Sequence, residues 1–422
     1  MHSVTNAIPT GTIASIPAKA HAHRALICAA LANSPSTILL SRTSKDIDAT
    51  MESLRGLGAH VVYENKVVTV TPGPVPAKGN VVPHESGTTL RLLLPVAASI
   101  CNDIDVDAKG RLPDRPLEPM LGEMKAHGVT FSQDKPPFTM TGRLQGGQFS
   151  MVGDVSSQFF SGLLLAAPQI GLSTITATTP LQSSDYVTLT TETMRDFGVE
   201  VEHTLPDTNI NEAFTVPFGA SFIGRDNYQI EGDWSNAAIW MVAAGMTGKP
   251  ITITGMNKNS VQADRRIMQV MIDAGCDVVW DGMNVTVTGR ASKPIHADLE
   301  QMPDMLPVMA ALACSISGES SFVKGARLRL KESDRLIAVA NLVRDLGGTV
   351  REEGDDLYII GSGILKGGHG DCVNDHRLVM AGTLMALISE NPVTLQDSEA
   401  ITKSYPDFFE DWNLLGGDAH GI

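Results

Sequence analysis

Residues 235–255 read SNAAIWMVAAGMTGKPITITG, an apolar, alanine-rich segment followed by a short run of threonine and isoleucine. The same order of segments occurs six times along the chain, and the copies begin near Arg24, Thr89, Ser157, Ser235, Met305 and His376. The copies lie about 65–80 residues apart, which is longer than the common solenoid periods. An apolar run of helical length followed by β-branched residues predicts one buried helix and one strand in each copy.

A second kind of segment lies between the copies. One example reads LIAVANLVRDLGGTV at residues 336–350, an amphipathic run that ends in glycine and a strand. Glycine at this place is typical of a helix C-terminus. Each unit is therefore predicted to hold a buried helix, a surface helix and their strands. Six such units predict a duplicated, two-domain α/β architecture.

The predicted domains contain three units each. The first spans residues 18–230, and the second combines residues 1–17 with residues 231–422. We expect the strand before Pro17 to complete the second domain, and the polar region 206–227 to form a loop between the halves. The chain would then cross between the domains twice, near 16–19 and near 230–233. A double crossing of this kind behaves as a hinge.

Composition excludes several classes of protein. A chain of 422 residues with 43% hydrophobic residues is expected to be a soluble protein of more than one domain. The net charge of −15 argues against nucleic acid as a partner, although local positive charge can still bind small anions. The N-terminal segment MHSVTNAIPTGTIASIP lacks the basic start and apolar run of a signal peptide.

Residues 155–184 contain no charged residue or histidine and are long enough to suggest a membrane span. Pro168 and Gly171 interrupt this run, so a helix followed by a strand in a core is the preferred interpretation. The five cysteines are scattered without a Cys-x-x-Cys pair, which predicts buried, reduced thiols in a cytoplasmic protein.

Helix-capping residue types stand at or just before the starts of the apolar segments. They are Thr88, Thr89, Ser156, Ser157, Ser235, Asp304 and Asp375. The first copy has no such residue, because it reads Ala20-His21-Ala22-His23. If the units share one symmetry, the N-termini of the buried helices point the same way within each domain. Two facing domains would then direct six positive helix ends into one cleft, which would attract anions.

Lysine and arginine concentrate in the same segments, together with serine, glycine and acidic residues. The motifs read IPAKAHAHRAL, ESGTTLRLL, GRLPDRP, VSSQFF, QSSDY, MPDM, RLRLKESDRL, NDHR and ITKSYPDFF. Their order and spacing over essentially the whole chain resemble the 5-enolpyruvylshikimate-3-phosphate synthase family, also called 3-phosphoshikimate 1-carboxyvinyltransferases.

This resemblance implies a fold and an activity. The family fold is a two-domain inside-out α/β barrel, in which each domain holds three βαβαββ repeats and the active site lies in the interdomain cleft. The family transfers the enolpyruvyl group of phosphoenolpyruvate to the 5-hydroxyl of shikimate 3-phosphate by addition and elimination, on the shikimate pathway to chorismate and the aromatic amino acids. The resemblance further implies no metal, no cofactor, a cytoplasmic location and a monomer.

The resemblance also assigns binding residues. Phosphoenolpyruvate would be held by Lys19, Gly87, Arg91, Arg111, Gln158, Arg335, Arg377 and Lys403. Shikimate 3-phosphate would be held by Lys19, Arg24, Ser156, Ser157, Gln158, Ser183, Tyr186, Asp304, Arg327 and Lys331. Many cations suit this task, because the phosphates and carboxylates of the two substrates repel each other in a dry cleft and arginine binds such groups through paired hydrogen bonds.

The chemistry needs groups that exchange protons. By resemblance, Asp304 is the candidate base beside the 5-hydroxyl, and Glu332 is the candidate donor to the methylene carbon of phosphoenolpyruvate. Lys19 would lie near the reacting centre and share either role. Because cations keep a carboxyl ionised, Glu332 would have to take its proton from a coupled network.

One position departs from the family pattern. The family usually places a hydroxyl directly after the lysine, where this chain has Ala20. Its loss would cost about 1–3 kcal/mol of shikimate 3-phosphate binding unless His21, His23 or a water molecule replaces it.

Two other hypotheses remain at this point. The first is an enolpyruvyl transferase that acts on UDP-N-acetylglucosamine, but such enzymes carry a Lys-Asn pair and a reactive loop cysteine, and residues 108–115 contain no cysteine. The second is a catalytically weak anion-binding or regulatory protein on the same fold, which fold alone does not exclude. The joint presence of Lys19, Asp304 and Glu332 favours an enzyme.

Overall fold

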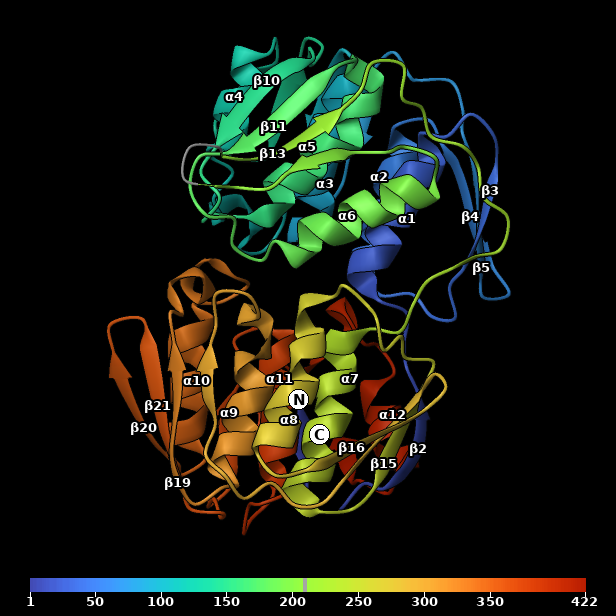
Figure 1. The fold of residues 1–422 in the computed structure, drawn as a ribbon. Helices are drawn as coiled ribbons and strands as arrows, with labels where there is room; N and C mark the ends of the chain where they lie inside the picture. The colour runs from blue at the N-terminus through green and yellow to red at the C-terminus, as the bar shows by residue number, and fades with distance from the viewer. Residues whose placement is uncertain (208–210) are drawn as a thin grey trace. The chain divides into compact units, whose positions relative to one another are not determined.

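A computed structural model describes residues 1–207 and 211–422, and this part of the chain forms two compact units (Figure 1). Unit 1 consists of Met1–Ile16 and Glu231–Ile422, and unit 2 consists of Pro17–Ile230. The chain therefore enters unit 2 at Pro17, one residue before the boundary expected from the sequence.

Unit 2 contains two sets of helices. Its long, apolar helices are α1 (Lys19–Ala30), α3 (Gly87–Ile100) and α5 (Ser157–Ile170). Its amphipathic helices are α2 (Lys45–Gly56), α4 (Met120–Ala126) and α6 (Asp185–Asp196). The described strands are β3 (Ser36–Leu39), β4 (His60–Glu64), β5 (Val67–Thr71), β6 (Gly79–Val81), β7 (Asp103–Val106), β8 (Thr130–Phe131), β9 (Phe138–Thr141), β10 (Gly147–Met151), β11 (Ser173–Ala177), β12 (Glu202–Thr204), β13 (Glu212–Val216) and β14 (Tyr228–Gln229).

Unit 1 repeats this arrangement. Its apolar helices are α7 (Trp234–Thr247), α9 (Leu306–Cys314) and α11 (His376–Ala386), and its outer helices are α8 (Ile267–Asp273), α10 (Arg335–Asp345) and α12 (Phe408–Leu414). The described strands are β1 (His2–Val4), β2 (Gly11–Ala14), β15 (Ile251–Thr254), β16 (Asp277–Asp281), β17 (Asn284–Thr288), β18 (His296–Asp298), β19 (Gly318–Val323), β20 (Thr349–Glu353), β21 (Asp356–Gly361), β22 (Gly368–Asp371), β23 (Val393–Gln396) and β24 (Ala419–Gly421).

Every sheet in the described residues has four strands and the same pattern. In the sheet β18-β19-β21-β20, the first pair is parallel and the other two pairs are antiparallel. With helices α9 and α10 between its strands, this segment runs β18-α9-β19-α10-β20-β21, which is the predicted βαβαββ repeat. The parallel pair needs a long crossover connection, and the buried helix supplies it.

The first strands of two repeats are exchanged between the units. Strand β2 leads directly into α1 of unit 2 but pairs with β15 of unit 1. Strand β14 leads into α7 of unit 1 but pairs with β3 of unit 2. The sequence predicted one strand before Pro17, whereas the structure has two, since β1 also pairs with β23 and β24. This exchange explains why the chain passes between the units twice.

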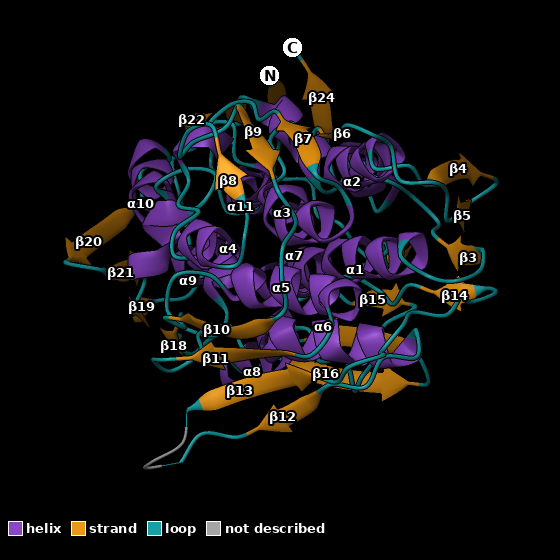
Figure 2. Cartoon of the chain, turned by 90° about the horizontal axis from the view of Figure 1, so that it is seen from above, coloured by secondary structure: helices purple, strands orange, loops and turns teal. Residues whose placement is uncertain are grey.

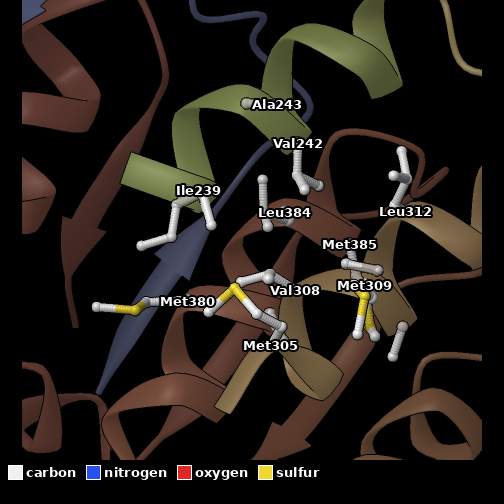
Figure 3. Packing of buried hydrophobic residues seen from close by; sticks show 14 of the residues in the cluster. Ile239, Val242, Ala243, Met305, Val308, Met309, Leu312, Met380, Leu384 and Met385 are labelled. Atoms are coloured by element: carbon white, nitrogen blue, oxygen red, sulfur yellow. The ribbon is translucent and has the colours of Figure 1, made fainter. Parts of the chain in front are cut away.

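In both units the apolar helices lie inside and the sheets lie outside. In unit 2, strands β3, β4 and β5 flank the outer side of α1 and α2 (Figure 2). In unit 1, side chains from α7, α9 and α11 pack against one another (Figure 3). All nine residues of α9 are buried, which is why its sequence is apolar all round rather than amphipathic.

Of two expectations about local structure, one is wrong in part and the other is confirmed. The region 206–227 is not a loop throughout, because Glu212–Val216 forms β13 and pairs with β11, and its buried Phe214 and Val216 alternate with less buried residues. Residues 208–210 of that predicted loop lie outside the described residues. The charge-free run 155–184 forms α5 and then β11, as predicted.

In the part of the chain that the structure describes, no helix has the length and apolar character needed to cross a bilayer. The five cysteines are buried and unpaired, as the sequence indicated.

Removal of one core side chain tests the helical interior of unit 1. Leu384 of α11 is fully buried among the apolar helices of unit 1, so Leu384→Ala should lower the free energy of unfolding by about 2–5 kcal/mol. Tryptophan fluorescence in a denaturant titration reports the unfolding of this unit alone, because all four tryptophans of the chain lie in unit 1. They are Trp234, Trp240, Trp280 and Trp412. The control is Leu414→Ala, at a side chain that is 75% exposed. This substitution should change the free energy of unfolding by less than about 0.5 kcal/mol.

Candidate functional site

The starts of α3 and α5 lie side by side in unit 2, and Gln158 joins them. Its Oε1 accepts a hydrogen bond from Arg91 Nη1 at 3.1 Å, and its Nε2 donates to Thr88 Oγ1 at 2.9 Å. A second nitrogen of Arg91 donates to the carbonyl of Pro116 at 3.1 Å. The guanidinium of Arg91 is thus fixed beside two helix N-termini, where the helix dipoles add to its attraction for an anion.

Arg24 lies in the same unit and is almost completely buried, with 1% of its surface exposed. Its nitrogens donate hydrogen bonds to four neutral oxygens: Thr190 Oγ1 at 2.7 Å, Ser161 Oγ at 3.3 Å, and the carbonyls of Ala20 at 2.7 Å and Tyr186 at 3.0 Å. Burial lowers the pKa of Arg24 to about 10, so it remains a cation at neutral pH. Among the described residues no carboxylate forms an ion pair with it.

Lys19 begins α1, and its Nζ lies 2.7 Å from Asp46 Oδ2 at the start of α2. The neighbouring histidines do not supply a positive charge in place of the hydroxyl missing at Ala20. His21 Nε2 lies 2.8 Å from Tyr228 Oη, and burial lowers the pKa of His21 to about 4. His23 Nδ1 lies 2.6 Å from Thr50 Oγ1, and burial also holds the pKa of His23 well below its usual value.

The helix caps differ in detail from those expected. Helix α5 is capped by Ser156 and α11 by Asp375, as predicted. Helix α3 is capped by Ser86 rather than by Thr88 or Thr89, and α7 by Asp233 rather than by Ser235. Asp304 caps no helix, and α1 has no side-chain cap.

The other predicted site residues of unit 2 differ in burial and in the element that carries them. Gly87 begins α3, and a Cβ there would lie 2.7 Å from Nη1 of Arg115. Arg111 is exposed, Ser157 and Ser183 are buried, and Ser183 has a left-handed backbone with φ of 54°. Tyr186 belongs to α6 and contacts Arg24 through its backbone carbonyl. The structure thus brings Gly87, Arg91 and Gln158 together. Arg111 is exposed on an adjacent loop, whose Lys109, Gly110 and Arg115 lie against residues 84–87.

Arg335 organises the predicted site residues of unit 1. Its side chain is 1% exposed and contacts three carboxylates. Nη1 donates to Asp304 Oδ1 and Nη2 donates to Glu332 Oε2, both at 2.6 Å. Nε and Nη2 donate to the two oxygens of Asp375 at 3.0 and 3.2 Å. Burial alone would lower the pKa of Arg335, but Asp375, Glu332 and Asp304 together raise it.

Asp304 has further cationic neighbours. Its Oδ1 lies 3.2 Å from Lys331 Nζ, and its Oδ2 lies 3.7 Å from Arg377 Nη2. Burial would raise the pKa of Asp304, but Lys331, Arg377 and Arg335 outweigh this effect and hold it well below the usual value. Asp304 is therefore ionised at neutral pH and can accept a proton, while the adjacent cations limit its basicity.

Two lysines and one arginine complete this group. Burial lowers the pKa of Lys331, and Asp304 opposes that effect while Arg327 adds to it. Lys403 is buried and donates from Nζ to the carbonyl of Asn374 at 2.7 Å, next to the cap of α11. The predicted residues Asp304, Arg327, Lys331, Glu332, Arg335 and Arg377 therefore form one cluster around the starts of α9, α10 and α11, and Lys403 lies beside the cap of α11.

Comparison with known proteins identifies the family. A family model described as EPSP synthase (3-phosphoshikimate 1-carboxyvinyltransferase) matches residues 7–412. The chain belongs to the EPSP synthase family. It is 36% identical over 413 residues to a 3-phosphoshikimate 1-carboxyvinyltransferase of Clostridium kluyveri, covering 97% of this chain and 95% of the relative. It is 34% identical over 417 residues to the protein of the same name in Methanocorpusculum labreanum, covering 97% of each.

Solved structures support the fold. The structure of an EPSP synthase from Acinetobacter baumannii is 23% identical to this chain, covers 99% of both chains and has a TM-score of 0.80. At this identity the likeness concerns the architecture, which is the enolpyruvyl transferase fold that the repeats and motifs predicted.

Sequence reasoning missed three acidic residues of this EPSP synthase family member. It left out Asp46, which pairs with Lys19, and it gave Asp375 only a capping role although this residue also binds Arg335 and accepts from Ser333 Oγ at 3.0 Å. It also left out Asp264, which accepts a hydrogen bond from Ser235 Oγ. No local pattern marks Asp46 or Asp264, because each acts on a residue far away in the sequence.

Asp264 makes the stability of unit 1 depend on pH. Burial raises the pKa of Asp264 to about 6, so its carboxyl binds a proton more readily in the folded chain than in the unfolded chain. Between about pH 4 and 6 the folded state then loses stability as pH rises, by about 3 kcal/mol in total. Relative to wild type, Asp264→Asn should therefore gain stability as pH rises from 4 to 7, measured by tryptophan fluorescence in urea. Parallel pH curves for the two proteins would contradict this.

Proposed function

We propose that this chain is a 3-phosphoshikimate 1-carboxyvinyltransferase, which transfers the enolpyruvyl group of phosphoenolpyruvate to the 5-hydroxyl of shikimate 3-phosphate and releases phosphate. The observation that carries the proposal is family membership over residues 7–412, together with relatives of this name that match 97% of the chain. The carboxyl and cationic groups at the helix starts of each unit are those that the reaction requires.

We propose that the clusters of both units act on the same pair of substrates. In unit 2, Arg24 is a buried cation with hydrogen bonds to neutral oxygens, which leaves its charge available to the carboxylate or phosphate of shikimate 3-phosphate. Arg91 and Gln158 are fixed for phosphoenolpyruvate by contacts with each other and with backbone. Preorganised groups of this kind bind anions without a large cost in side-chain entropy.

We assign the proton transfers to unit 1. Asp304 is ionised in the free protein because three cations surround it. Substrate anions that draw Lys331 and Arg377 toward themselves would weaken those contacts and make Asp304 a stronger base at the moment when the 5-hydroxyl needs one. Glu332 forms an ion pair with Arg335 at 2.6 Å, so in this assignment it first takes a proton from the surrounding network of coupled groups and then donates that proton to the methylene carbon.

We also propose that the enzyme works as a monomer in the cytoplasm. Its five cysteines are buried thiols without disulfide partners, which suits a reducing compartment. This part of the proposal is tested by sedimentation of the purified chain and by its distribution after cell fractionation.

Phosphate release tests the proposed reaction. Wild-type protein should release phosphate from phosphoenolpyruvate only when shikimate 3-phosphate is present. Asp304→Asn should lower kcat at least about 100-fold, because it removes the base, while calorimetry should still detect binding of shikimate 3-phosphate. The control Asp298→Asn, a surface carboxylate of the same unit paired with Lys324, should leave turnover unchanged.

Two results would count against this assignment. Phosphate release by wild type that does not need shikimate 3-phosphate would indicate a different acceptor or simple hydrolysis. Unchanged kcat in Asp304→Asn would remove Asp304 from the chemistry, even if the overall reaction were observed.

Restoration of the hydroxyl at position 20 tests the departure from the family pattern. Ala20 is partly exposed in the first turn of α1, so a serine fits there. Ala20→Ser should strengthen shikimate 3-phosphate binding by about 1–3 kcal/mol, a decrease in Kd of roughly 5- to 150-fold. Ala30→Ser, at the other end of the same helix, is the matched control and should leave Kd unchanged. An equal Kd for Ala20→Ser and wild type would show that position 20 does not contact this ligand.

A further inference from the structure

A buried chain of hydrogen bonds in unit 2 joins helices α1, α2 and α3. His23 Nδ1 of α1 lies 2.6 Å from Thr50 Oγ1 of α2, which lies 2.7 Å from Thr89 Oγ1 of α3. Thr89 Oγ1 then donates to Oγ of Ser86, the cap of α3, at 2.8 Å. Each of the four residues is at most 1% exposed, so their polar groups depend on one another rather than on solvent.

The donors and acceptors of this hydrogen-bond chain can be assigned in order. Thr89 has one hydroxyl hydrogen, which goes to Ser86 Oγ or to the carbonyl of Asp46 at 3.3 Å. Thr89 Oγ1 must therefore accept from Thr50, and this contact uses the one hydroxyl hydrogen of Thr50. The hydrogen in the last contact then has to come from His23 Nδ1. The imidazole ring is thus the first donor of a chain that ends at the cap of α3.

The second ring nitrogen of His23 agrees with this assignment. Nε2 is buried and has no hydrogen-bond partner among the described residues. Burial, together with Lys19 and Arg24, holds the pKa of His23 well below its usual value, so the ring is neutral at pH 7 and carries one hydrogen. A buried N–H without an acceptor is rarer in proteins than a buried acceptor without a donor. The hydrogen is therefore expected on Nδ1, where Thr50 accepts it.

Ser86, the last acceptor, holds the first turn of α3. Its Oγ also accepts from the backbone N–H of Thr89 at 3.2 Å, and its carbonyl accepts from the N–H of Leu90 at 3.1 Å. A capping side chain of this kind contributes to the stability of the helix start. The hydrogen that Thr89 donates fixes the orientation of the cap, and that hydrogen is directed to Ser86 because Thr50 already donates to Thr89.

The same turn carries contacts of the proposed phosphoenolpyruvate site. Thr88 Oγ1 accepts from Gln158 Nε2 at 2.9 Å, and Gln158 Oε1 accepts from Arg91 Nη1 at 3.1 Å. We propose that His23 is a positioning residue that holds this turn of α3 in place for an anionic substrate. The proposal rests on the proposed function, in which Arg91 binds phosphoenolpyruvate. His23 is fully buried, so it acts through Thr50 and α3 and does not touch the substrate.

Nitrogen-15 NMR of the histidine rings tests the assignment without any substrate. The signals of His23 are identified as those that His23→Asn removes. At pH 7 the spectrum should show hydrogen on Nδ1 and none on Nε2. Hydrogen on Nε2, or on both nitrogens, would overturn the proposal.

Thr50→Val breaks the hydrogen-bond chain at its centre with little change in side-chain volume. The amides of Thr89 and Leu90 should then exchange with solvent faster than in wild type. At saturating shikimate 3-phosphate, KM for phosphoenolpyruvate should rise roughly tenfold with kcat largely unchanged, because a buried hydrogen-bond partner is lost and the turn is held less firmly. Unchanged exchange rates or an unchanged KM would overturn the proposal.

Thr193→Val is the matched control. Thr193 of α6 is also buried in unit 2, and its hydroxyl donates to the carbonyl of Leu189 at 2.7 Å. The same substitution there should leave KM for phosphoenolpyruvate and the two amide exchange rates unchanged. A rise in KM equal to that of Thr50→Val would contradict a specific role for the hydrogen-bond chain.

Two substitutions of His23 separate positioning from a general loss of stability. His23→Asn places a side-chain N–H where Nδ1 lies, so KM should stay close to that of wild type. His23→Leu has no donor and should raise KM as Thr50→Val does. The double variant His23→Leu/Thr50→Val should be no worse than either single variant, because both break the same chain. Equal effects of the two His23 substitutions, or additive effects in the double variant, would contradict the proposal.

Phosphate release by wild type separates this proposal from the proposed function. Activity in wild type without the expected effects of Thr50→Val would overturn only the role of His23. If wild type releases no phosphate, the proposed function fails, and the ring nitrogens and amide exchange rates still decide whether His23 holds the start of α3.

Discussion

The ion pairs of Arg335 fix the geometry of the acidic site residues in unit 1. This single buried guanidinium contacts Asp304 before α9, Glu332 before α10 and the capping Asp375 of α11. Asp304 and Glu332 belong to one repeat of the fold and Asp375 belongs to the next, and the position of each carboxylate depends on the same cation. Loss of one partner from such a buried group leaves the remaining charges uncompensated, at a cost of about 3–5 kcal/mol. The stability of unit 1 and the geometry of the carboxyl groups proposed for proton transfer are therefore linked.

The arginines of unit 2 have different hydrogen-bond partners from Arg335 of unit 1. Its buried Arg24 is surrounded by neutral oxygens, and Arg91 is held by Gln158 and a backbone carbonyl. Cations with neutral partners keep their charge for a ligand, whereas the paired cations of unit 1 hold and tune carboxyl groups. In the proposed function, Arg24 and Arg91 would supply local positive charge for anionic substrates in a chain with a net charge of −15.

The sequence predicted the repeats well because they depend on local patterns. Apolar runs of helical length and β-branched strands identify α5 and β11 without any knowledge of tertiary contacts. Interactions between distant residues were harder to predict. Asp264 and Ser235 are 29 residues apart, and Lys19 and Asp46 are 27 apart, so nothing in either local segment marks the pair. The cap of α3 was misplaced for a different reason, since Ser86, Thr88 and Thr89 are all capping residue types and only the backbone geometry selects Ser86.

Identification of the product tests the central claim most directly. Wild-type protein should be incubated with phosphoenolpyruvate and shikimate 3-phosphate, and the acceptor should then be examined by mass spectrometry and carbon NMR. The account predicts one carboxyvinyl ether at the 5-hydroxyl of shikimate 3-phosphate and an equal amount of free phosphate. Recovery of unmodified shikimate 3-phosphate from active-site-intact, folded protein, or a carboxyvinyl group on another hydroxyl, would contradict it.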